Sequence, residues 1–447
     1  MKRTRIAAAV LTAALIGTGL AACSPGGGAG GGAAAGSGSP ADLEAALEKG
    51  GEITYWAWAP ASEAKAKAFE EKYPNVTVNY VNAGSGVDEY TKITNAIKAG
   101  TGAPDVAQIE YTAMPQFYLA DNLVDLSGYG FGDLEDDYIP GSWSAVASGD
   151  QVFGLPEDSG PMAMFYNKRV FDQYGITVPT TWDEFSAAAE TLHAADPNQY
   201  LTSDGGDGYF ASSMIWQAGG HPFQVDGTDV TIDLQDEGTA KWTGVWNELV
   251  EKKLLSPTPS YTDDWYKQLG NGQIAALISG AWMPSLLESA APEGSGDWQA
   301  APMPTYDGTA ASANFGGSAQ GVISQTKNPA LAAAFVQWIN DTPEGVQILQ
   351  DSGSFPSTVA ALTAPEFAEA TSDYFGGQQV NKVLLDAADT VPEGWQYLPF
   401  QTYAQTIFAD SVGQSYASNS DLNPGLKKWQ DSLVSYGNEQ GFTVTGK

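Results

Sequence analysis

The residue types that could do chemistry in this chain of 447 residues are mainly aromatic and acidic. The sequence has 13 Trp, 20 Tyr and 17 Phe, but only two histidines, His193 and His221, and one cysteine, Cys23. So few His and Cys argue against a zinc site, a disulfide framework and cysteine catalysis, and we predict no cofactor and no metal. Aromatic residues are plentiful, while metal-binding and nucleophilic residue types are scarce. The composition therefore favours binding over catalysis.

The candidate ligand-binding residues lie in short aromatic and polar segments spread along the chain. Trp58 is favoured over its neighbour Trp56, because side chains alternate along a strand and one of the two is expected in the core. Trp282 is the strongest aromatic candidate, since Gly280 and Ala281 before it let a ring leave the strand end, with core packing as the alternative. The candidates are Trp56, Trp58, Glu110, Tyr111, Asp158, Trp216, Gln217, Trp282, Gly316, Gly317, Trp395 and Tyr397.

Other possible sites are weaker. Residues 204–208 look like a fragment of a calcium loop, but the spaced third oxygen ligand and the distal Glu are missing. The serines have no evident histidine partner, so a Ser–His–Asp arrangement is improbable. We predict a plain loop and no nucleophilic triad.

The N-terminus has the pattern of an export signal. Lys2, Arg3 and Arg5 precede an apolar run that is too short and interrupted to span a bilayer, which predicts a signal peptide over residues 1–22. Residues 20–23, Leu-Ala-Ala-Cys, resemble a bacterial lipobox, and Cys23 stands directly before a Gly/Ala/Ser-rich stretch. We predict lipidation of Cys23, a flexible tether over residues 23–50, and a lipid-anchored protein on the extracytoplasmic face of a bacterial membrane.

Regular elements must place the candidate residues. Residues 53–58 form a β-branched and aromatic run, residues 62–72 an amphipathic helix, and residues 76–81 a second strand pattern, which together predict a βαβ unit. A further helix near residues 88–99 and a strand over residues 105–109 continue the pattern. Thr181 is the predicted N-cap of a helix that starts at Trp182. Trp58 and Glu110 then lie at the carboxyl ends of parallel strands, where ligands bind in open α/β sheets.

Length and charge narrow the class of protein. A chain this long is expected to form two domains or lobes. Its 53 Asp and Glu against 20 Lys and Arg give a formal net charge of −33, which argues against nucleic-acid binding.

The order of several motifs resembles one family, the type 1 extracellular solute-binding proteins of carbohydrate ABC importers, which are similar to maltose-binding protein. The matching segments run from about residue 52 to residue 356 and include residues 53–56, 69–74, 102–106, 166–168, 179–184, 271–277, 280–282 and 316–318. The resemblance implies an α/β, two-lobed periplasmic-binding-protein-like (type II) fold with three hinge crossings, expected near residues 154–161, 315–322 and 353–357. Lobe 1 would comprise residues 51–156 and 322–354, and lobe 2 residues 157–321 and 355–447.

The same resemblance implies a function. The protein would be a monomer that binds a carbohydrate, with an oligosaccharide favoured over a monosaccharide, and delivers it to membrane permease subunits by lobe closure, without catalysis. It also implies that Asp158 is an acidic sugar contact, with Glu157 as the competing choice. A secreted glycoside hydrolase and a polyamine-binding protein are the alternatives, since paired carboxylates and tryptophans would suit both.

Overall fold

The computed structural model describes residues 38–447. The predicted signal peptide and the lipidation site Cys23 lie outside the described residues. Within residues 38–447, no helix has the length and apolar character needed to span a membrane.

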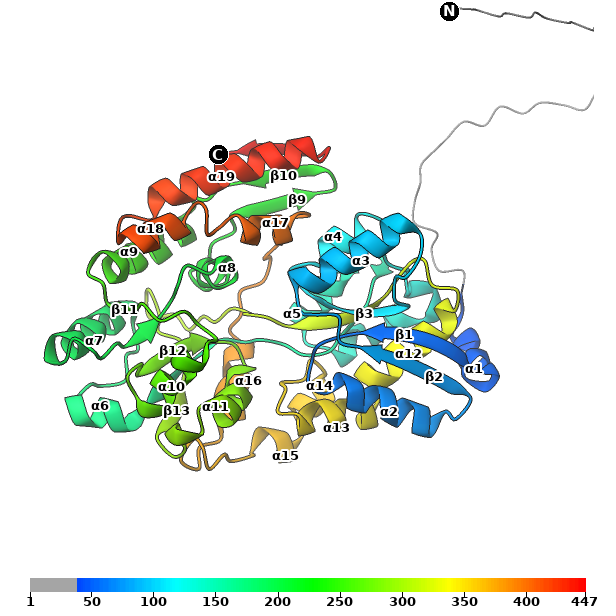
Figure 1. Ribbon diagram of the computed structural model, residues 1–447, viewed down its shortest axis with the longest axis horizontal. Coiled ribbons are helices and arrows are strands. Elements are labelled where there is room, and N and C mark those ends of the chain that lie inside the picture. The colour runs from blue at the N-terminus through cyan, green and yellow to red at the C-terminus, as the bar shows by residue number, and fades with distance from the viewer. Residues whose placement is uncertain (1–37) are drawn as a thin grey trace, which may run out of the picture. The chain divides into compact units, whose positions relative to one another are not determined.

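The described residues fold into two lobes with separate hydrophobic cores (Figure 1). The first core runs from Leu43 to Leu155 and resumes at Ala319. The second lobe contains two core clusters, which together take in residues from Met162 to Phe315 and from Phe355 to Val444. The chain therefore passes between the lobes three times, which confirms the predicted type II architecture.

The first lobe is built on a five-stranded sheet in the order β2-β1-β3-β14-β6. Strand β1 pairs in parallel with β2 and β3, which confirms the predicted βαβ unit, whereas β14 pairs antiparallel with β3 and β6. The elements of this lobe are α1 (Pro40–Lys49), β1 (Gly51–Trp56), α2 (Ser62–Lys72), β2 (Val76–Val81), α3 (Val87–Ala99), β3 (Val106–Glu110), α4 (Met114–Tyr118), η1 (Ser127–Tyr129), η2 (Phe131–Asp137), α5 (Pro140–Val146), β4 (Ala147–Ser148), β5 (Gln151–Val152), β6 (Leu155–Pro156), β14 (Ser318–Val322), α12 (Pro329–Asp341) and α13 (Pro343–Asp351).

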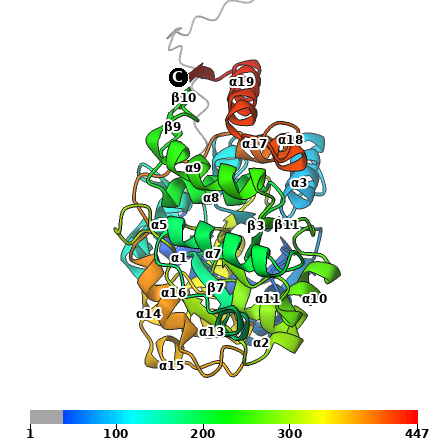
Figure 2. The same ribbon diagram turned by 90° about the vertical axis from the view of Figure 1, so that its left-hand side faces the viewer.

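The second lobe has a small antiparallel sheet, β12-β7-β13, with helices around it and a C-terminal layer in which β15 joins β10 and β9. In Figure 2, α7, α8 and α9 face the viewer and α19 lies above them. Its elements are β7 (Ala163–Asn167), α6 (Lys168–Tyr174), α7 (Trp182–Ala195), β8 (Thr202–Ser203), α8 (Gly208–Gln217), β9 (Phe223–Asp226), β10 (Asp229–Ile232), α9 (Glu237–Glu251), β11 (Leu255–Ser256), α10 (Asp263–Asn271), β12 (Ala276–Ser279), α11 (Met283–Ala290), η3 (Pro292–Gly294), β13 (Trp298–Ala301), α14 (Val359–Leu362), α15 (Pro365–Ala368), α16 (Val380–Ala388), α17 (Gln401–Thr406), α18 (Gly413–Ser418), α19 (Asn423–Glu439) and β15 (Thr443–Gly446).

One predicted segment is wrong in part. The last residues of the predicted tether, Pro40–Lys49, form helix α1 instead of flexible chain. Ser39 and Asp42 make a capping box and Pro40 occupies the first helical turn, so the local sequence starts a helix there. Leu43 is buried in the first core, which anchors α1 to the lobe.

Local signals explain other boundaries. The Thr181 side chain accepts a hydrogen bond from the Glu184 N–H at 3.2 Å, and the Glu184 carboxylate accepts one from the Thr181 N–H at 3.3 Å. This capping box confirms the predicted start of α7 at Trp182. Strand β14 begins at Ser318, directly after Gly316 and Gly317, whose φ angles of 89° and 98° require glycine.

Candidate functional site

The first lobe contributes side chains from the carboxyl ends of β1 and β3. The Tyr90 hydroxyl donates to Glu110 Oε2 at 2.9 Å and accepts the Glu110 N–H, also at 2.9 Å. The Trp58 ring meets the Tyr90 ring edge-on, with centroids 6.1 Å apart. Gln108 Oε1 accepts the Trp58 N–H at 3.0 Å, which fixes the turn after β1. Trp58, Tyr90 and Glu110 therefore form one connected group at the sheet edge.

The N-terminus of α8 brings the second lobe against this group. Asp207 caps α8 by accepting the Tyr209 N–H at 2.8 Å. The pKa of Glu110 is raised, mainly by burial and also by the nearby charge of Asp207. Hydrogen bonds from Tyr90 and Tyr209 act in the opposite direction and lower it in part. Burial also raises the pKa of Asp207, to about 6. The charges of a carboxyl in the first lobe, Glu110, and one in the second, Asp207, therefore influence one another.

A second group of aromatic residues lies beside α8. The rings of Trp216 and Trp395 are stacked, with centroids 5.2 Å apart and an angle of 9° between their planes. Trp216 Nε1 donates to the Pro392 carbonyl at 2.7 Å, which holds the loop carrying Trp395 against α8. Tyr397 stands nearly perpendicular to both indoles and packs against the cores of both lobes. The structure therefore brings the predicted residues Trp216, Trp395 and Tyr397 together at the lobe interface.

These aromatic residues line a narrow cavity between the lobes. Its volume is only 10 Å³, about the space of one water molecule. Its lining comes from the turn after β3, α8, the second crossing, the loop before α17, and α17 itself: Thr112, Tyr209, Ser212, Ser213, Trp216, Asn314, Phe315, Gly316, Trp395, Tyr397 and Gln405.

Several polar groups in this lining are buried without a partner. Thr112 Oγ1, Trp395 Nε1 and both amide atoms of Gln405 have no hydrogen-bond partner among residues 38–447. An unpaired buried polar group costs about 1–3 kcal/mol, so four in one cavity call for a functional reason. A ligand that carries both hydroxyl donors and acceptors would satisfy all of them.

Trp282 connects this cavity to the outside of the second lobe. Its Nε1 donates to the Phe315 carbonyl at 2.7 Å, and the Trp282 and Phe315 rings lie 5.5 Å apart. A Cβ at Gly316 would lie 3.0 Å from Trp282 Nε1, and one at Gly317 only 2.6 Å from the Tyr111 ring. Both predicted glycines are therefore required by close packing of the second crossing as well as by their φ angles.

Tyr111 and Asp158 join the crossings to one another. The Tyr111 hydroxyl donates to the Asp158 carbonyl at 2.7 Å, and Asp158 Oδ1 accepts from the Ser318 N–H and hydroxyl, both at 2.8 Å. Burial, with a contribution from Glu157, raises the pKa of Asp158 to about 7. The competing candidate Glu157 forms a fully buried ion pair with Lys65 at 2.9 Å. A ligand contact of Tyr111 or Asp158 stays a prediction.

The candidates Gln217 and Trp56 also lie outside the cavity lining. Gln217 is buried, where its oxygen accepts from Trp182 Nε1 at 3.2 Å and its nitrogen donates to the carbonyls of Pro304 and Ala311. Trp56 is half-buried against the first core. Their roles in ligand binding also stay predictions.

Seven of the eleven lining residues were not predicted from the sequence: Thr112, Tyr209, Ser212, Ser213, Asn314, Phe315 and Gln405. Thr112 follows the predicted pair Glu110 and Tyr111, and Tyr209 follows an Asp that caps a helix, so both carried a weak local signal. Gln405 carried none, because only the packing of α17 against α8 places it there.

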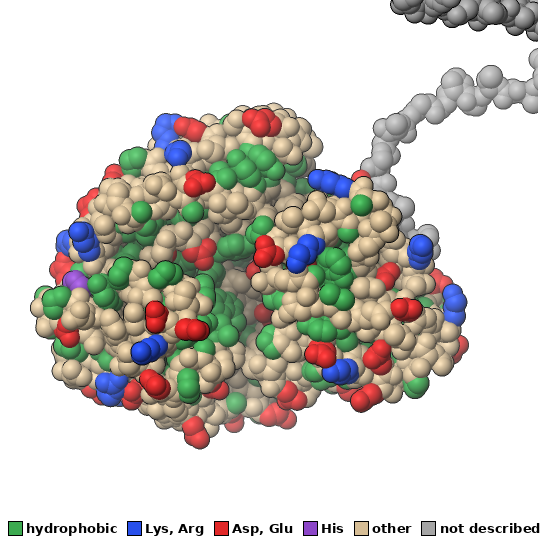
Figure 3. Space-filling model, in the orientation of Figure 1, with side chains coloured by type: hydrophobic (Ala, Val, Ile, Leu, Met, Phe, Trp, Pro, Cys, Tyr) green, Lys and Arg blue, Asp and Glu red, His purple; other side chains and the backbone are tan. Residues whose placement is uncertain are grey.

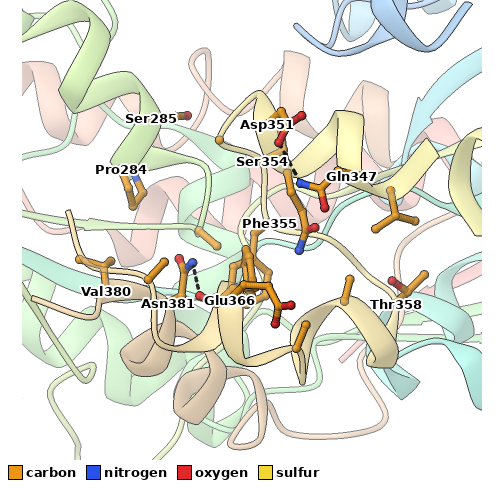
Figure 4. Close-up of a pocket in the computed structure, with 18 of the residues that line it drawn as sticks. Pro284, Ser285, Gln347, Asp351, Ser354, Phe355, Thr358, Glu366, Val380 and Asn381 are labelled. Atoms are coloured by element: carbon orange, nitrogen blue, oxygen red, sulfur yellow. Dashed lines mark hydrogen bonds between the residues drawn. The ribbon is translucent and has the colours of Figure 1, made fainter. Parts of the chain in front are cut away.

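A larger groove, with a volume of about 680 Å³, lies between α11, α13 and the segment from α14 to α16 (Figure 4). Its polar side chains pair with the protein: Gln347 donates to Asp351 at 2.8 Å, and Asn381 to the Phe367 carbonyl at 2.9 Å. None of its lining residues in the described chain has a buried unpaired polar atom. Of the two cavities, only the narrower one is lined by buried polar atoms that have no partner in the described chain.

The face shown in Figure 3 is hollowed between the two lobes, with acidic side chains on both sides of the hollow. Within residues 38–447, no group of three or more His, Cys, Asp or Glu side chains is placed to hold a metal ion.

Comparison with known proteins places this site in context. The family model for bacterial extracellular solute-binding proteins matches residues 50–345. A solved structure of an ABC-transporter-associated binding protein from B. animalis subsp. lactis Bl-04, in complex with β-1,6-galactobiose, is 42% identical, with a TM-score of 0.82, covering 88% of this chain and 99% of that one.

Two further proteins are similar over most of their length. The lactose-binding protein of Rhizobium radiobacter is 26% identical, over 76% of this chain and 83% of that protein. The galacto-N-biose/lacto-N-biose I-binding protein of Bifidobacterium longum, solved with lacto-N-biose, is 24% identical with a TM-score of 0.77, covering 89% of this chain and 99% of that one; this likeness supports the fold alone.

Proposed function

This chain belongs to the bacterial extracellular solute-binding proteins, and we propose that it binds a short galactose-containing oligosaccharide and delivers it to an ABC importer. Members of this family bind solutes and are not enzymes, so the glycoside hydrolase alternative is not supported. The 42% identity to a protein solved with β-1,6-galactobiose, and the similarity to a lactose-binding protein, support the choice of a galactoside.

The observation that carries the proposal is the cavity between Trp216, Trp395 and Gln405. It combines stacked indoles with buried donors and acceptors that have no partner in residues 38–447. Sugars carry an apolar C–H face beside hydroxyls that both donate and accept, so one sugar ring matches both features.

The geometry also supports delivery by lobe closure. Ligand sites for small molecules usually have volumes of about 300–1,000 Å³, so this cavity is closed too tightly to admit a sugar as it stands. The lobes must rotate apart for entry. A sugar that contacts Thr112 in the first lobe and Gln405 in the second binds the closed form more tightly, and so shifts the population toward it. A permease that recognises the closed form would accept only loaded protein.

The proposal includes the cell location. A signal peptide over residues 1–22 and a lipid on Cys23 would hold a monomeric protein on the outer face of the membrane, and the Leu-Ala-Ala-Cys motif supports this anchor. Cys23→Ser should abolish incorporation of radiolabelled palmitate and release the protein from the membrane fraction. Unchanged membrane retention of the variant would contradict the anchor.

Isothermal titration of purified protein with β-1,6-galactobiose, lactose, lacto-N-biose, maltose and spermidine tests the ligand class. We expect binding of at least one galactoside and weaker or no binding of maltose. Binding of spermidine alone would replace the proposal with a polyamine-binding protein, and binding of maltose alone would contradict the galactoside.

A further inference from the structure

Gln396 stands between Trp395 and Tyr397, which both line the cavity, but its own side chain is exposed and bonds to a strand. Gln396 Oε1 accepts the Val225 N–H at 2.9 Å, and Gln396 Nε2 donates to the Val225 carbonyl at 3.2 Å. One side-chain amide therefore pairs with both backbone groups of one residue, as a neighbouring strand would. The two residues are 171 positions apart in the sequence, so these bonds are not part of a local turn.

The strand that carries Val225 is a firm support. Val225 lies in β9, an outer strand of the sheet β15-β10-β9. The outer edge of such a strand presents backbone donors and acceptors that have no strand partner, and Gln396 occupies this edge at Val225. Phe223 of the same strand is buried against Trp429 of α19, with centroids 6.3 Å apart, and its ring also meets that of Trp395 at 6.0 Å. The strand is thus packed into the second lobe and touches the loop at two residues.

The loop around Gln396 has few other attachments. Within residues 38–447, no backbone–backbone hydrogen bond involves residues 393–397, and the two bonds of Gln396 are the only side-chain hydrogen bonds of this segment. Gly394 has a φ of 84°, and only one atom, His221 Cε1 at 3.7 Å, lies within 4 Å of the place where a Cβ would be. The backbone is therefore loosely packed there, and the segment depends on Gln396 for its hydrogen-bonded attachment.

We propose that Gln396 is a positioning residue for ligand binding: by fastening the loop to the edge of β9, it holds the Trp395 indole stacked on Trp216 before the sugar arrives. This inference rests on the proposed function and adds to it the residue that orders the aromatic wall. Gln396 does not line the cavity, so it acts through Trp395. A ligand that must first order a loop binds less tightly, because the entropy lost in ordering reduces the binding free energy.

Covering an open strand edge is the alternative role for Gln396. That role requires only a polar side chain over Val225, and it predicts that sugar affinity and indole stacking stay unchanged when Gln396 is replaced. The place of Gln396 directly between Trp395 and Tyr397, in a segment without other hydrogen bonds in the described chain, favours the positioning role.

Calorimetric titration of β-1,6-galactobiose into wild type, Gln396→Ala, Gln396→Met and Gln325→Ala tests the proposal. Gln396→Met keeps the length of the side chain but makes neither bond. Gln325→Ala is the matched control, because Gln325 is also an exposed glutamine with a distant backbone partner, the Ile97 carbonyl at 2.8 Å, but does not line the cavity. We expect both Gln396 variants to bind at least fivefold more weakly and Gln325→Ala to stay within twofold of wild type, with similar melting temperatures in all three.

Circular dichroism supplies a readout that a merely structural role would not move. Two parallel indoles 5.2 Å apart couple their electronic transitions, and the loss of this exciton signal in Trp395→Ala identifies it among the 13 Trp. The signal should be weaker in free Gln396→Ala and Gln396→Met, and saturating galactobiose should restore it, because the bound sugar orders the loop. In the Trp395→Ala background, Gln396→Ala should weaken binding by less than a further twofold.

Unchanged affinity in both Gln396 variants would overturn the positioning role and leave Gln396 as a cover for the strand edge. An unchanged exciton signal, or an undiminished loss in the Trp395→Ala background, would also overturn it. So would an equal loss in Gln325→Ala, because general destabilisation would then explain the effect. Failure of wild type to bind galactobiose would overturn the galactoside ligand instead, and the exciton signal of the free variants would still decide whether Gln396 orders Trp395.

Discussion

The indole of Trp216, at the end of α8, lies parallel to that of Trp395, in the loop before α17, with centroids 5.2 Å apart. The two residues come from distant parts of the chain, and the hydrogen bond from Trp216 Nε1 to the Pro392 carbonyl fixes their pairing. The aromatic wall of the cavity is therefore assembled from a core helix and a C-terminal loop. A change in that loop would alter this wall of the cavity without disturbing the sheet.

Trp395→Ala should weaken galactoside binding about 30-fold, which corresponds to about 2 kcal/mol, because the indole supplies both a stacking face and an unpaired donor. Its melting temperature should change little, since Trp395 is only partly buried. Calorimetric titration beside a thermal melt checks both. Tyr73→Ala, which removes a half-buried ring packed on Phe69 at the C-terminal end of α2, is the control and should keep the affinity within threefold. Equal loss in both variants would contradict the placement of the cavity.

Gln405→Met should weaken binding about tenfold and leave the unliganded protein equally or more stable. Both amide atoms of Gln405 are buried without partners in the described chain. Methionine has a similar size and no amide, so the substitution removes the desolvation cost of these unpaired atoms, about 1–3 kcal/mol. Urea unfolding with and without ligand measures the two effects separately.

Gln217→Met is the matched control for that experiment. The Gln217 amide oxygen accepts a hydrogen bond from Trp182 Nε1, and its nitrogen donates to the Pro304 carbonyl. Replacing Gln217 with methionine leaves the Trp182 donor without a partner in the core. This variant should be destabilised by about 1–3 kcal/mol. If Gln405→Met loses as much stability as Gln217→Met, the Gln405 amide is paired in the free protein and the argument from unpaired groups is wrong.

The sequence predicted the framework of the site better than its lining. The βαβ pattern and the Thr181 capping box are local, and the structure confirms both. Glu110 and Trp58 were predicted at one sheet edge because parallel strands place their carboxyl ends together, and the structure joins both to Tyr90 there, while their contact with ligand stays a prediction. Gln405 was not, because its position depends on how α17 packs, which no local pattern encodes.

Some candidates were found for a reason that proved incomplete. Gly316 and Gly317 are among the predicted ligand-binding residues, and the structure shows that their backbone lies close to the Trp282 and Tyr111 rings, while a contact with ligand stays a prediction. Gln217 was chosen because it follows Trp216 in the sequence. Successive residues of a helix point in directions about 100° apart, however, and the Gln217 side chain is buried in the core. Adjacency in sequence is therefore a poor guide on a helix.

Gly317→Ala should destabilise the protein and weaken ligand binding, because a Cβ there would lie 2.6 Å from the Tyr111 ring at a φ of 98°. Tyr111 would have to move, and with it the hydrogen bond to the Asp158 carbonyl that joins the turn after β3 to the first crossing. Thermal melts and titrations should both show the loss. Gly132→Ala is the control, since nothing lies within 4 Å of its added Cβ. An unchanged Gly317→Ala protein would show that the second crossing is free to shift.

Glu89→Gln should stabilise the protein by an amount that grows between about pH 4.5 and pH 8. Glu89 is fully buried in the first turn of α3, and neither of its oxygens has a partner among the described residues. Burial raises the pKa of its carboxyl to about 8, although Lys92 lowers it. Between the unfolded pKa and the folded pKa, the native state holds a proton that the unfolded chain has lost. The free energy of unfolding of wild type therefore falls as the pH rises, by at most about 1.4 kcal/mol per unit.

The glutamine variant lacks this titration, so its advantage over wild type should be smallest at pH 4.5 and largest at pH 8, above which it levels off. Urea unfolding at pH 4.5, 6 and 8 measures the difference at each pH. Glu71→Gln, at an exposed position of α2, is the control and should show no such trend. A difference between Glu89→Gln and wild type that is constant with pH would mean that Glu89 is ionised in the folded protein, and that an unidentified partner stabilises its charge.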